Sequence, residues 1–272
     1  MNKIVRNYLS VILLTCPASF AVADGTAHPF ISDTFSVQLG VFQPSKDLKL
    51  SVDGSVSGVN QQFDWEAATG LGRDDEIFML EGKWRFGEKW SFRAQYYKAS
   101  ESDRAVLEQQ VLWRNSIILA GSNVSAGTEF SLVRAFFGRS FGSRENVDTG
   151  IGLGLHWLEM GAFIRPDVNT IGELSAATVS GPLPNIGGWY YYSPSPKWIL
   201  GGRVDWLEAS IDKYDGGIVN VSGGVNYQLF KHVGVGLSYQ LFRLNVDISN
   251  DKWNGSVTLD YDGPFIYLSG NW

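Results

Sequence analysis

The stretch KWRFGEKWSFRAQYY, from Lys83 to Tyr97, alternates two kinds of side chain on either side of a Gly-Glu-Lys turn. Most aromatic residues lie at even-numbered positions, and most basic or polar residues lie at odd-numbered positions. Side chains on a β-strand point to opposite faces with a period of two, so the stretch predicts an antiparallel hairpin. The aromatic face would be the core of a soluble protein, but it would face lipid in a membrane barrel. The hairpin alone does not distinguish these two folds.

The same alternation recurs along the chain. About ten strands are predicted, at residues 35–41, 78–86, 90–97, 130–141, 149–157, 185–192, 198–206, 219–229, 233–241 and 266–272. Residues 48–56 and 63–71 alternate weakly, so a barrel of twelve strands is one alternative. A barrel of eight strands is the other alternative. No amphipathic helix of ordinary length and no linker interrupts the pattern, which predicts a single all-β domain.

The predicted connections alternate between tight and long. Tight ones are expected at 87–89, 142–146, 193–197 and 230–232, and long ones at 44–75, 100–128, 165–184, 209–216 and 247–255. Transmembrane barrels have short periplasmic turns, long extracellular loops and aromatic residues near the membrane interfaces. Apolar faces of nine or ten residues match the tilted strand that crosses a bilayer. We therefore expect a closed antiparallel transmembrane β-barrel, with Leu153 and Val235 facing lipid.

The N-terminus is typical of an export signal. Lys3 and Arg6 precede an apolar run, and Ala21 and Ala23 frame a small-x-small cleavage site, which predicts a signal peptide at 1–23 and one barrel domain at 24–272. Lipidation of Cys16 is the alternative. Cys16 is the only cysteine, so its removal would leave no disulfide and no thiolate metal ligand.

The charge of the exported chain argues against a nucleic-acid partner. The signal holds two basic and no acidic residues, which leaves 20 basic and 28 acidic residues in the rest. Binding to a phosphate backbone requires a basic surface instead. No apolar run long enough for a spanning helix follows the signal.

The C-terminal stretch GPFIYLSGNW is an alternating strand that ends on an aromatic residue, Trp272. It resembles the last strand of Gram-negative outer-membrane barrels, and the stretch from Arg139 to Trp157 resembles small barrels of the OmpA/OmpW-like kind. The resemblance implies location in the cell outer membrane and contact with its lipids and lipopolysaccharide. It also implies that Trp272 is an assembly signal for the barrel assembly machinery. We expect a monomer.

Charged residues share the parity that would face the lumen. We predict a polar network there, formed by Glu81, Lys83, Arg85, Arg93, Asp148, His156, Arg203 and Asp205. Buried charges need partners or water, so cross-lumen pairs are expected. Gly150, Gly152 and Gly154 lack the spacing of a dinucleotide fingerprint. As small inward residues, they would instead let side chains from opposite strands fill the lumen.

Catalytic and metal-binding patterns are weak. Only His28, His156 and His232 are available, and only His156 points inward on a strand, with Leu158 where an outer-membrane lipase would have serine. A protease site of the omptin kind would need Asp74 and Asp75 beside His156. Cation binding at the cell surface is the alternative for the loop acids, which are expected to be solvated turn residues: Asp74, Asp75, Asp212, Asp215, Asp247, Asp251, Asp260 and Asp262. We predict no catalytic residue, no cofactor and no metal site.

The strand number bears on function. Eight strands give an interior that side chains just fill, so a ten-strand barrel should have a filled or narrow lumen. We expect an outer-membrane barrel with a polar, largely filled lumen and a structural or surface-interaction role, rather than an enzyme. A narrow channel for small solutes is the alternative, and an enzyme at the external rim is the third candidate.

Overall fold

The computed structural model describes residues 27–52, 55–56, 59–60, 62–71, 76–113, 116–141, 145–167, 176–211, 214–249 and 254–272. The predicted signal peptide, with Cys16, lies outside the described residues, as do Asp74, Asp75, Asp212 and Asp251. In the described ranges, no helix is both long enough and apolar enough to cross a membrane.

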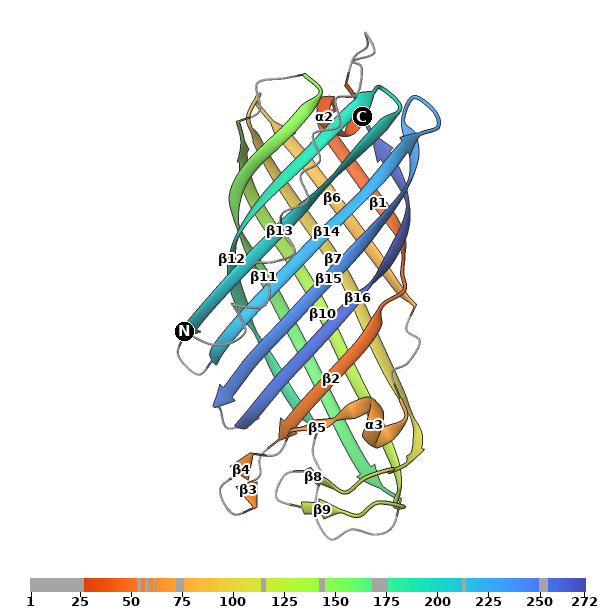
Figure 1. The fold of residues 1–272 in the computed structure, drawn as a ribbon, viewed down its shortest axis with the longest axis vertical. Helices are drawn as coiled ribbons and strands as arrows, with labels where there is room; N and C mark the ends of the chain where they lie inside the picture. The colour runs from red at the N-terminus through yellow and green to blue at the C-terminus, as the bar shows by residue number, and fades with distance from the viewer. Residues whose placement is uncertain are drawn as a thin grey trace.

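Ten antiparallel strands form a closed barrel (Figure 1). In order around the wall they are β1 (Phe35–Phe42), β6 (Ile77–Phe86), β7 (Trp90–Val106), β10 (Asn123–Ser140), β11 (Val147–Pro166), β12 (Ala177–Ser195), β13 (Trp198–Ile211), β14 (Tyr214–Gln228), β15 (Val233–Ser249) and β16 (Asn254–Asn271). The barrel closes where β1 pairs with β16, for example at Leu39 and Leu268. The predicted fold class is confirmed.

The two ends of the barrel differ. The turn end carries the tight connections β6–β7, β10–β11, β12–β13 and β14–β15, together with the short helix α2 (Pro29–Ser32) and the chain's C-terminus (Figure 1). The opposite end, the loop end, carries the smaller elements. These are β3 (Ser55–Val56), β4 (Val59–Asn60), β5 (Phe63–Asp64), α3 (Trp65–Thr69), β8 (Val111–Trp113) and β9 (Ser116–Ile118).

The two weakly alternating segments do not add wall strands. β2 (Ser45–Val52) follows β1 after a two-residue break and pairs with the loop-end half of β16. Residues 63–71 contain α3, because Asp64 Oδ1 accepts a hydrogen bond from the Ala67 amide at 2.7 Å as an N-cap. Gly70, at φ 71°, ends the helix in the left-handed conformation that glycine favours.

Several strands are longer than the sequence pattern predicts. β11 has 20 residues and β10 has 18, whereas about 9–11 residues cross a bilayer. The expected long connection at 209–216 is consequently tight, since β13 ends at Ile211 and β14 begins at Tyr214. The extra length lies at the loop end.

The exterior carries an apolar band with aromatic residues at both edges. Leu153 is 66% exposed and Val235 is 36% exposed, as expected for lipid-facing positions. Exposed aromatic residues border the band on the turn-end side at Trp84, Trp90, Trp198 and Trp272, and on the loop-end side at Tyr96, Trp157, Trp206 and Tyr239. Beyond the second border the outward side chains become charged, as in the exposed pair of Lys98 and Glu129. This arrangement fits a membrane-spanning band with a projecting loop end.

Candidate functional site

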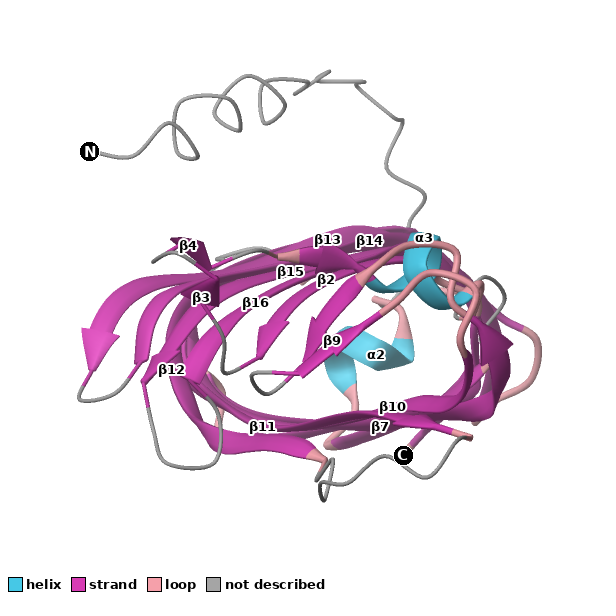
Figure 2. Ribbon diagram, turned by 90° about the horizontal axis from the view of Figure 1, so that it is seen from below, coloured by secondary structure: helices cyan, strands magenta, loops and turns pink. Residues whose placement is uncertain are grey.

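The lumen is occupied at the turn end by α2 (Figure 2). The helix begins at Pro29, whose fixed φ suits the first helical position, and His28 Nδ1 accepts a hydrogen bond from the Phe30 amide at 3.1 Å. The Phe30 ring lies 5.0 Å from the Tyr191 ring, and Lys83 Nζ donates to the Phe30 carbonyl. His28 is fully buried. The segment preceding β1, here called the plug, therefore lies inside the barrel at its turn end.

Near the plug, Asp148 contacts polar groups from several strands. Its carboxylate accepts hydrogen bonds from Trp189 Nε1 at 2.9 Å and from Ser140 Oγ at 2.8 Å. Arg85 and Arg93 place guanidinium nitrogens 3.7 and 3.8 Å from Asp148 Oδ2. Asp148 is 4% exposed, so its charge is held by these partners rather than by water.

A second buried cluster surrounds Asp205, which is 1% exposed. Arg203 Nε donates to its carboxylate at 2.9 Å, and Arg134 Nη2 donates to the other oxygen. Arg134 Nη1 also donates to Gln95 Oε1 at 3.1 Å. Because Arg134 is on β10 and Asp205 is on β13, which are not neighbours, the pair spans the lumen.

Aromatic rings connect the two clusters, because Trp189 beside Arg93 lies 6.0 Å from Phe136 beside Arg203. The guanidinium carbon of Arg93 lies 4.9 Å from the ring of Trp189 and 5.1 Å from the ring of Tyr191. Arg203 similarly lies 3.7 Å from the ring of Phe136. Stacked guanidinium groups of this kind lose water but keep a favourable electrostatic contact. Paired charges and rings thus lie together at the middle level of the lumen.

The inward glycines make room for these rings. A Cβ on Gly150 would meet Trp189 at 2.4 Å, and one on Gly152 would meet Phe136 at 2.7 Å. The rings that cover the glycines of β11 therefore come from the adjacent strands β12 and β10. Neighbouring strands, rather than the expected opposite strands, supply these two rings, because a flat ring can lie across the adjacent strand where no Cβ projects.

The loop-end half of the lumen is an apolar core. The ring of Phe130 on β10 lies 5.9 Å from that of Phe242 on β15 and 5.5 Å from that of Tyr261 on β16. Because these strands stand on opposite sides of the barrel, the contacts cross the lumen. Leu132 and Met79 are buried in the same core. The predicted polar residues therefore lie at the middle and turn-end levels, while the loop-end half has the inward contact of Lys46 Nζ with Thr128 Oγ1 at 3.2 Å.

The structure separates the predicted polar residues into groups. Lys83, Arg85, Arg93 and Asp148 meet near the plug, and Arg203 and Asp205 form the second cluster. His156 is fully buried beside that cluster, where its Nδ1 shares a hydrogen bond with the Asn185 amide. Glu81 instead lines a cavity of about 50 Å³ between the plug and the walls, together with Gln38, Asn226, Ser238 and Gln240.

Sequence reasoning missed Arg134 and Gln95. Gln95 has the inward parity of Arg93 within the opening hairpin. Arg134 shares its parity with Phe136, while Val133 and Phe137 point outward and are 46% exposed. The same period of two would have placed both residues in the lumen.

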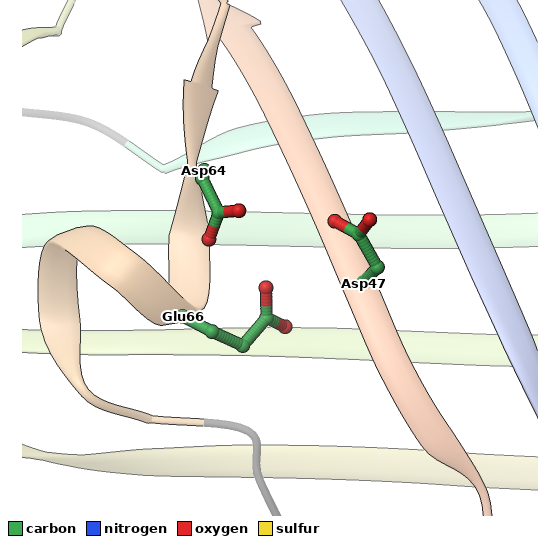
Figure 3. Close-up of side chains that lie close together, drawn as sticks. All are labelled: Asp47, Asp64 and Glu66. Carbon is green, nitrogen blue, oxygen red and sulfur yellow. The ribbon is translucent and has the colours of Figure 1, made fainter.

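Three acids lie close together on β2, β5 and α3 at the loop end (Figure 3). Oxygens of Asp47, Asp64 and Glu66 lie within 4.8 Å of one another. Each acid has a structural role: Asp64 caps α3, Glu66 Oε2 accepts from the Leu48 amide at 3.1 Å, and Asp47 bonds Lys49 Nζ at 2.9 Å. Burial raises the pKa of Glu66 to about 7. These contacts account for the cluster without a cation.

Among solved structures, the chain is similar to the outer membrane protease OmpT from Escherichia coli, with a TM-score of 0.57 and 12% identity over 88% of this chain and 96% of that chain. The fold is that of an outer-membrane β-barrel. The resemblance drawn from the C-terminal strand is confirmed at this level. At such low identity the likeness concerns the fold and does not transfer a function.

Two other similar structures have lower TM-scores. Ail, the attachment invasion locus protein of Yersinia pestis, has a TM-score of 0.36 and 11% identity over 87% of this chain and 96% of that chain. The Pseudomonas putida toluene transporter TodX has a TM-score of 0.33 and 10% identity over 88% of this chain and 89% of that chain. No family model and no curated protein matches the sequence.

Proposed function

We propose that the protein is an integral protein of the cell outer membrane and acts as a closed scaffold that presents its loop end for surface interactions. In this orientation the turn end lies in the periplasm, the apolar band faces lipid, and the loop end projects from the cell. The proposal rests on one observation. At successive levels of the lumen, side chains from separate parts of the wall contact one another.

A solute would have to pass each of these levels in turn. At the turn end α2 would have to leave, and in the middle the Arg134–Asp205 pair would have to separate inside the barrel. Separating buried charges is costly because each is left without its partner. At the loop end the aromatic contacts of Phe130 would have to open. These requirements favour a scaffold over the alternative, a narrow channel for small solutes.

An enzymatic role is not part of the proposal, because the positions of the histidines do not support one. The chain has three histidines. His28 precedes α2 and His232 lies in the β14–β15 turn, both at the turn end, while His156 is fully buried in the lumen. A site of the omptin kind would need a histidine at the loop end, beside acids such as Asp74 and Asp75, which lie outside the described residues.

The same placement suggests the partners. The apolar band would contact outer-membrane lipids, including lipopolysaccharide in the outer leaflet. During biogenesis the assembly machinery would read the last strand, where Trp272 exchanges backbone hydrogen bonds with Phe35 at 2.8 and 3.0 Å. A single copy closes its own barrel, so a monomer is the simplest functional unit.

Solute uptake by vesicles tests the closed lumen. Full-length mature protein would be refolded into liposomes and diluted into isotonic solutions of arabinose or glycine. We expect swelling no faster than in protein-free liposomes, provided that the recovered protein is heat-modifiable and therefore folded. Swelling that rises in proportion to the amount of folded protein would support the channel instead.

Surface labelling tests the orientation. The predicted mature chain lacks cysteine, so single cysteines have no background. Leu119 is exposed near the loop end and Lys89 is exposed in a turn-end connection. We expect Leu119→Cys to react with a membrane-impermeant maleimide on intact cells, and Lys89→Cys only after the outer membrane is permeabilised. The reverse pattern would overturn the orientation.

A further inference from the structure

A polar cavity of about 50 Å³ lies between the plug and the wall. Phe30 of α2 lines it from the plug, and β1, β6, β14 and β15 contribute polar side chains from the wall. These side chains are Gln38, Glu81, Ser222, Asn226, Ser238 and Gln240. A cavity needs only about 10–15 Å³ of such volume to hold one water. The cavity can therefore hold a small ion together with some of its water.

The wall leaves this space because its inward residues are small. Ser222 and Gly224 line the cavity from β14, and Ser238 lines it from β15. By contrast, the inward side chains of β10 and β12 include Phe136 and Trp189, whose buried rings lie 6.0 Å apart. The cavity is therefore a consequence of small residues in one part of the wall.

Glu81 supplies the only carboxylate among the described residues that line the cavity. No described lysine, arginine or histidine has a nitrogen within 4.0 Å of this carboxylate, whereas Asp148 has Arg85 and Arg93 at 3.7 and 3.8 Å. Arg93 is near enough for the charge of Glu81 to act on it, but its Nη1 donates to Tyr191 Oη at 3.1 Å. A carboxylate in the interior needs a counter-charge or water. The described fold does not supply Glu81 with a paired cation.

Neutral oxygen atoms line the same space. Gln240 Nε2 donates to Ser238 Oγ at 3.2 Å, so Gln240 Oε1 is the part of this amide that can accept another contact. Gln38 stands directly opposite Glu81 in the β1–β6 ladder. In the described part of the chain, the side chains of Gln38 and Ser222 form no hydrogen bond with another residue. Carboxylate, carbonyl and hydroxyl oxygens are the ligands that hard cations prefer.

We propose that this cavity is a binding site for one monovalent cation, sodium or potassium. Glu81 is its charged ligand, and the side-chain oxygens of Gln38, Ser222 and Gln240 are the neutral ligands available to it. Alternation along single strands could not identify this site, because its oxygens come from β1, β6, β14 and β15 and meet only in the closed barrel.

The charge of the lining favours a monovalent ion over a divalent one. One carboxylate balances one positive charge, whereas calcium takes about six to eight oxygen ligands that usually include several carboxylates. Positive charge also lies close to the plug already. Lys83 Nζ donates to the Phe30 carbonyl, and the guanidinium carbon of Arg93 lies 5.9 Å from the Phe30 ring.

The ion would enter from the turn end, past α2, because the contacts of Phe130 fill the loop-end half of the lumen. This site goes beyond the proposed scaffold function and does not rest on it. A conducting barrel would still present Glu81 to a cation, and a closed barrel without the ion would still be a scaffold. Vesicle swelling tests the closed lumen, and cation-dependent stability tests the site.

The dependence of stability on cation identity tests the proposal. The full mature chain would be refolded into nonionic detergent micelles and unfolded with urea in sodium, potassium or choline chloride at constant ionic strength. Choline is too bulky for the cavity but screens the exposed acids equally. A ligand that binds only the folded state stabilises it by mass action. A tenfold rise in sodium or potassium above its dissociation constant should therefore raise the folded-to-unfolded ratio about tenfold. Equal stability in all three salts would overturn the proposal.

A pair of variants locates the effect. Glu81→Gln should abolish the difference between the salts, because the amide carries no charge. The matched control is Glu88→Gln, at an exposed position in the turn of the same hairpin, which should keep the wild-type dependence. A dependence on sodium or potassium that persists in folded Glu81→Gln would overturn the site.

Anomalous scattering supplies a direct arm that does not require the variant to fold. Wild-type crystals grown in rubidium chloride, with rubidium in place of potassium, should show an anomalous peak beside the Glu81 carboxylate. Peaks confined to exposed acids, or a cavity that holds only water, would overturn the proposal.

Discussion

Asp205 holds the middle level of the lumen together. Its two oxygens accept hydrogen bonds from the guanidinium groups of Arg134 and Arg203, and the residue is almost completely buried. A buried ion pair contributes little net stability relative to an apolar replacement, because both charges lose water. Removing a single member is different, since the remaining cations keep the desolvation penalty without their counter-ion.

Asp205→Asn should therefore lower the free energy of unfolding by about 3–5 kcal/mol. The measurement is reversible urea unfolding in detergent micelles, followed by tryptophan fluorescence. Asp260→Asn is the matched control, because Asp260 pairs with Arg243 at 3.8 Å on the exterior and is 41% exposed at its side chain. Exposed pairs contribute about 0–1 kcal/mol. Equal effects of the two substitutions would contradict the assigned role.

Glu66 should make the packing of α3 depend on pH. Burial raises its pKa from 4.5 to about 7, so between these values the folded state binds more protons than the unfolded state. The stability contributed by protonated Glu66 is therefore fully present below pH 4.5 and declines as the pH rises to about 7. Amide protection factors at Trp65–Thr69, corrected for intrinsic exchange, should be lower at pH 8 than at pH 5.

Glu66→Gln should remove this dependence, because the amide does not titrate. Glu108→Gln is the control, since Glu108 is exposed while its amide donates to the Ala68 carbonyl at 2.9 Å. If Glu66→Gln keeps the wild-type pH dependence, another group is responsible.

At the residue level, parity predicts the direction of a side chain but not its partner. Arg93 and Asp148 face inward as the period of two predicts. The contact of Asp148 with Trp189 depends on strand register and barrel size, which a single sequence does not specify. The acids of Figure 3 were also unpredictable as a group, because β2 and α3 are brought together only by the folded loop end.

At the scale of elements, strand centres were easier to predict than strand ends. All ten wall strands lie where alternation predicts them, but β12 begins at Ala177 rather than near residue 185. Proline at 182 and 184 lacks the N–H group that a strand ladder uses, and the structure accommodates both by leaving one edge unpaired. α2 was also missed, because four residues are too few to show a helical period.

The last strand carries a prediction about assembly. Trp272 is 56% exposed at the turn end, stacks on Phe35 at 6.4 Å and closes the β1–β16 seam through backbone hydrogen bonds. Deleting Trp272 should reduce insertion into the outer membrane of cells, with the signal still cleaved, because an interfacial anchor and an assembly signal are both lost. Refolding into detergent should suffer less, since it involves no recognition step.

Trp272→Phe is the matched control and should insert almost normally, because it keeps an aromatic ring at the same position. Insertion is measured as heat-modifiable protein in isolated outer membranes. Wild-type insertion of the deletion variant, or a Phe variant as defective as the deletion, would contradict the recognition role.

At the scale of the whole molecule, the barrel reverses its polarity along its axis. In the band bordered by tryptophans, apolar residues face out and charges face in. At the loop end the core is apolar and the exterior is charged, as at Lys98 and Glu129. The reversal is visible in β7, whose outward residues change from Trp90 and Phe92 to Lys98. The closed barrel followed from the sequence pattern, but the contacts across the lumen required the folded register.

Conductance of single molecules in planar lipid bilayers tests the closed lumen most directly. Wild-type protein and a variant lacking residues 27–33 would be compared, with insertion verified by heat-modifiable protein in the same vesicles. Both should show no steady conductance, because the Arg134–Asp205 level and the Phe130 core remain after α2 is removed. Steady conductance from the wild type would contradict the closed scaffold, and steady conductance from the deletion alone would show that α2 is the only closure.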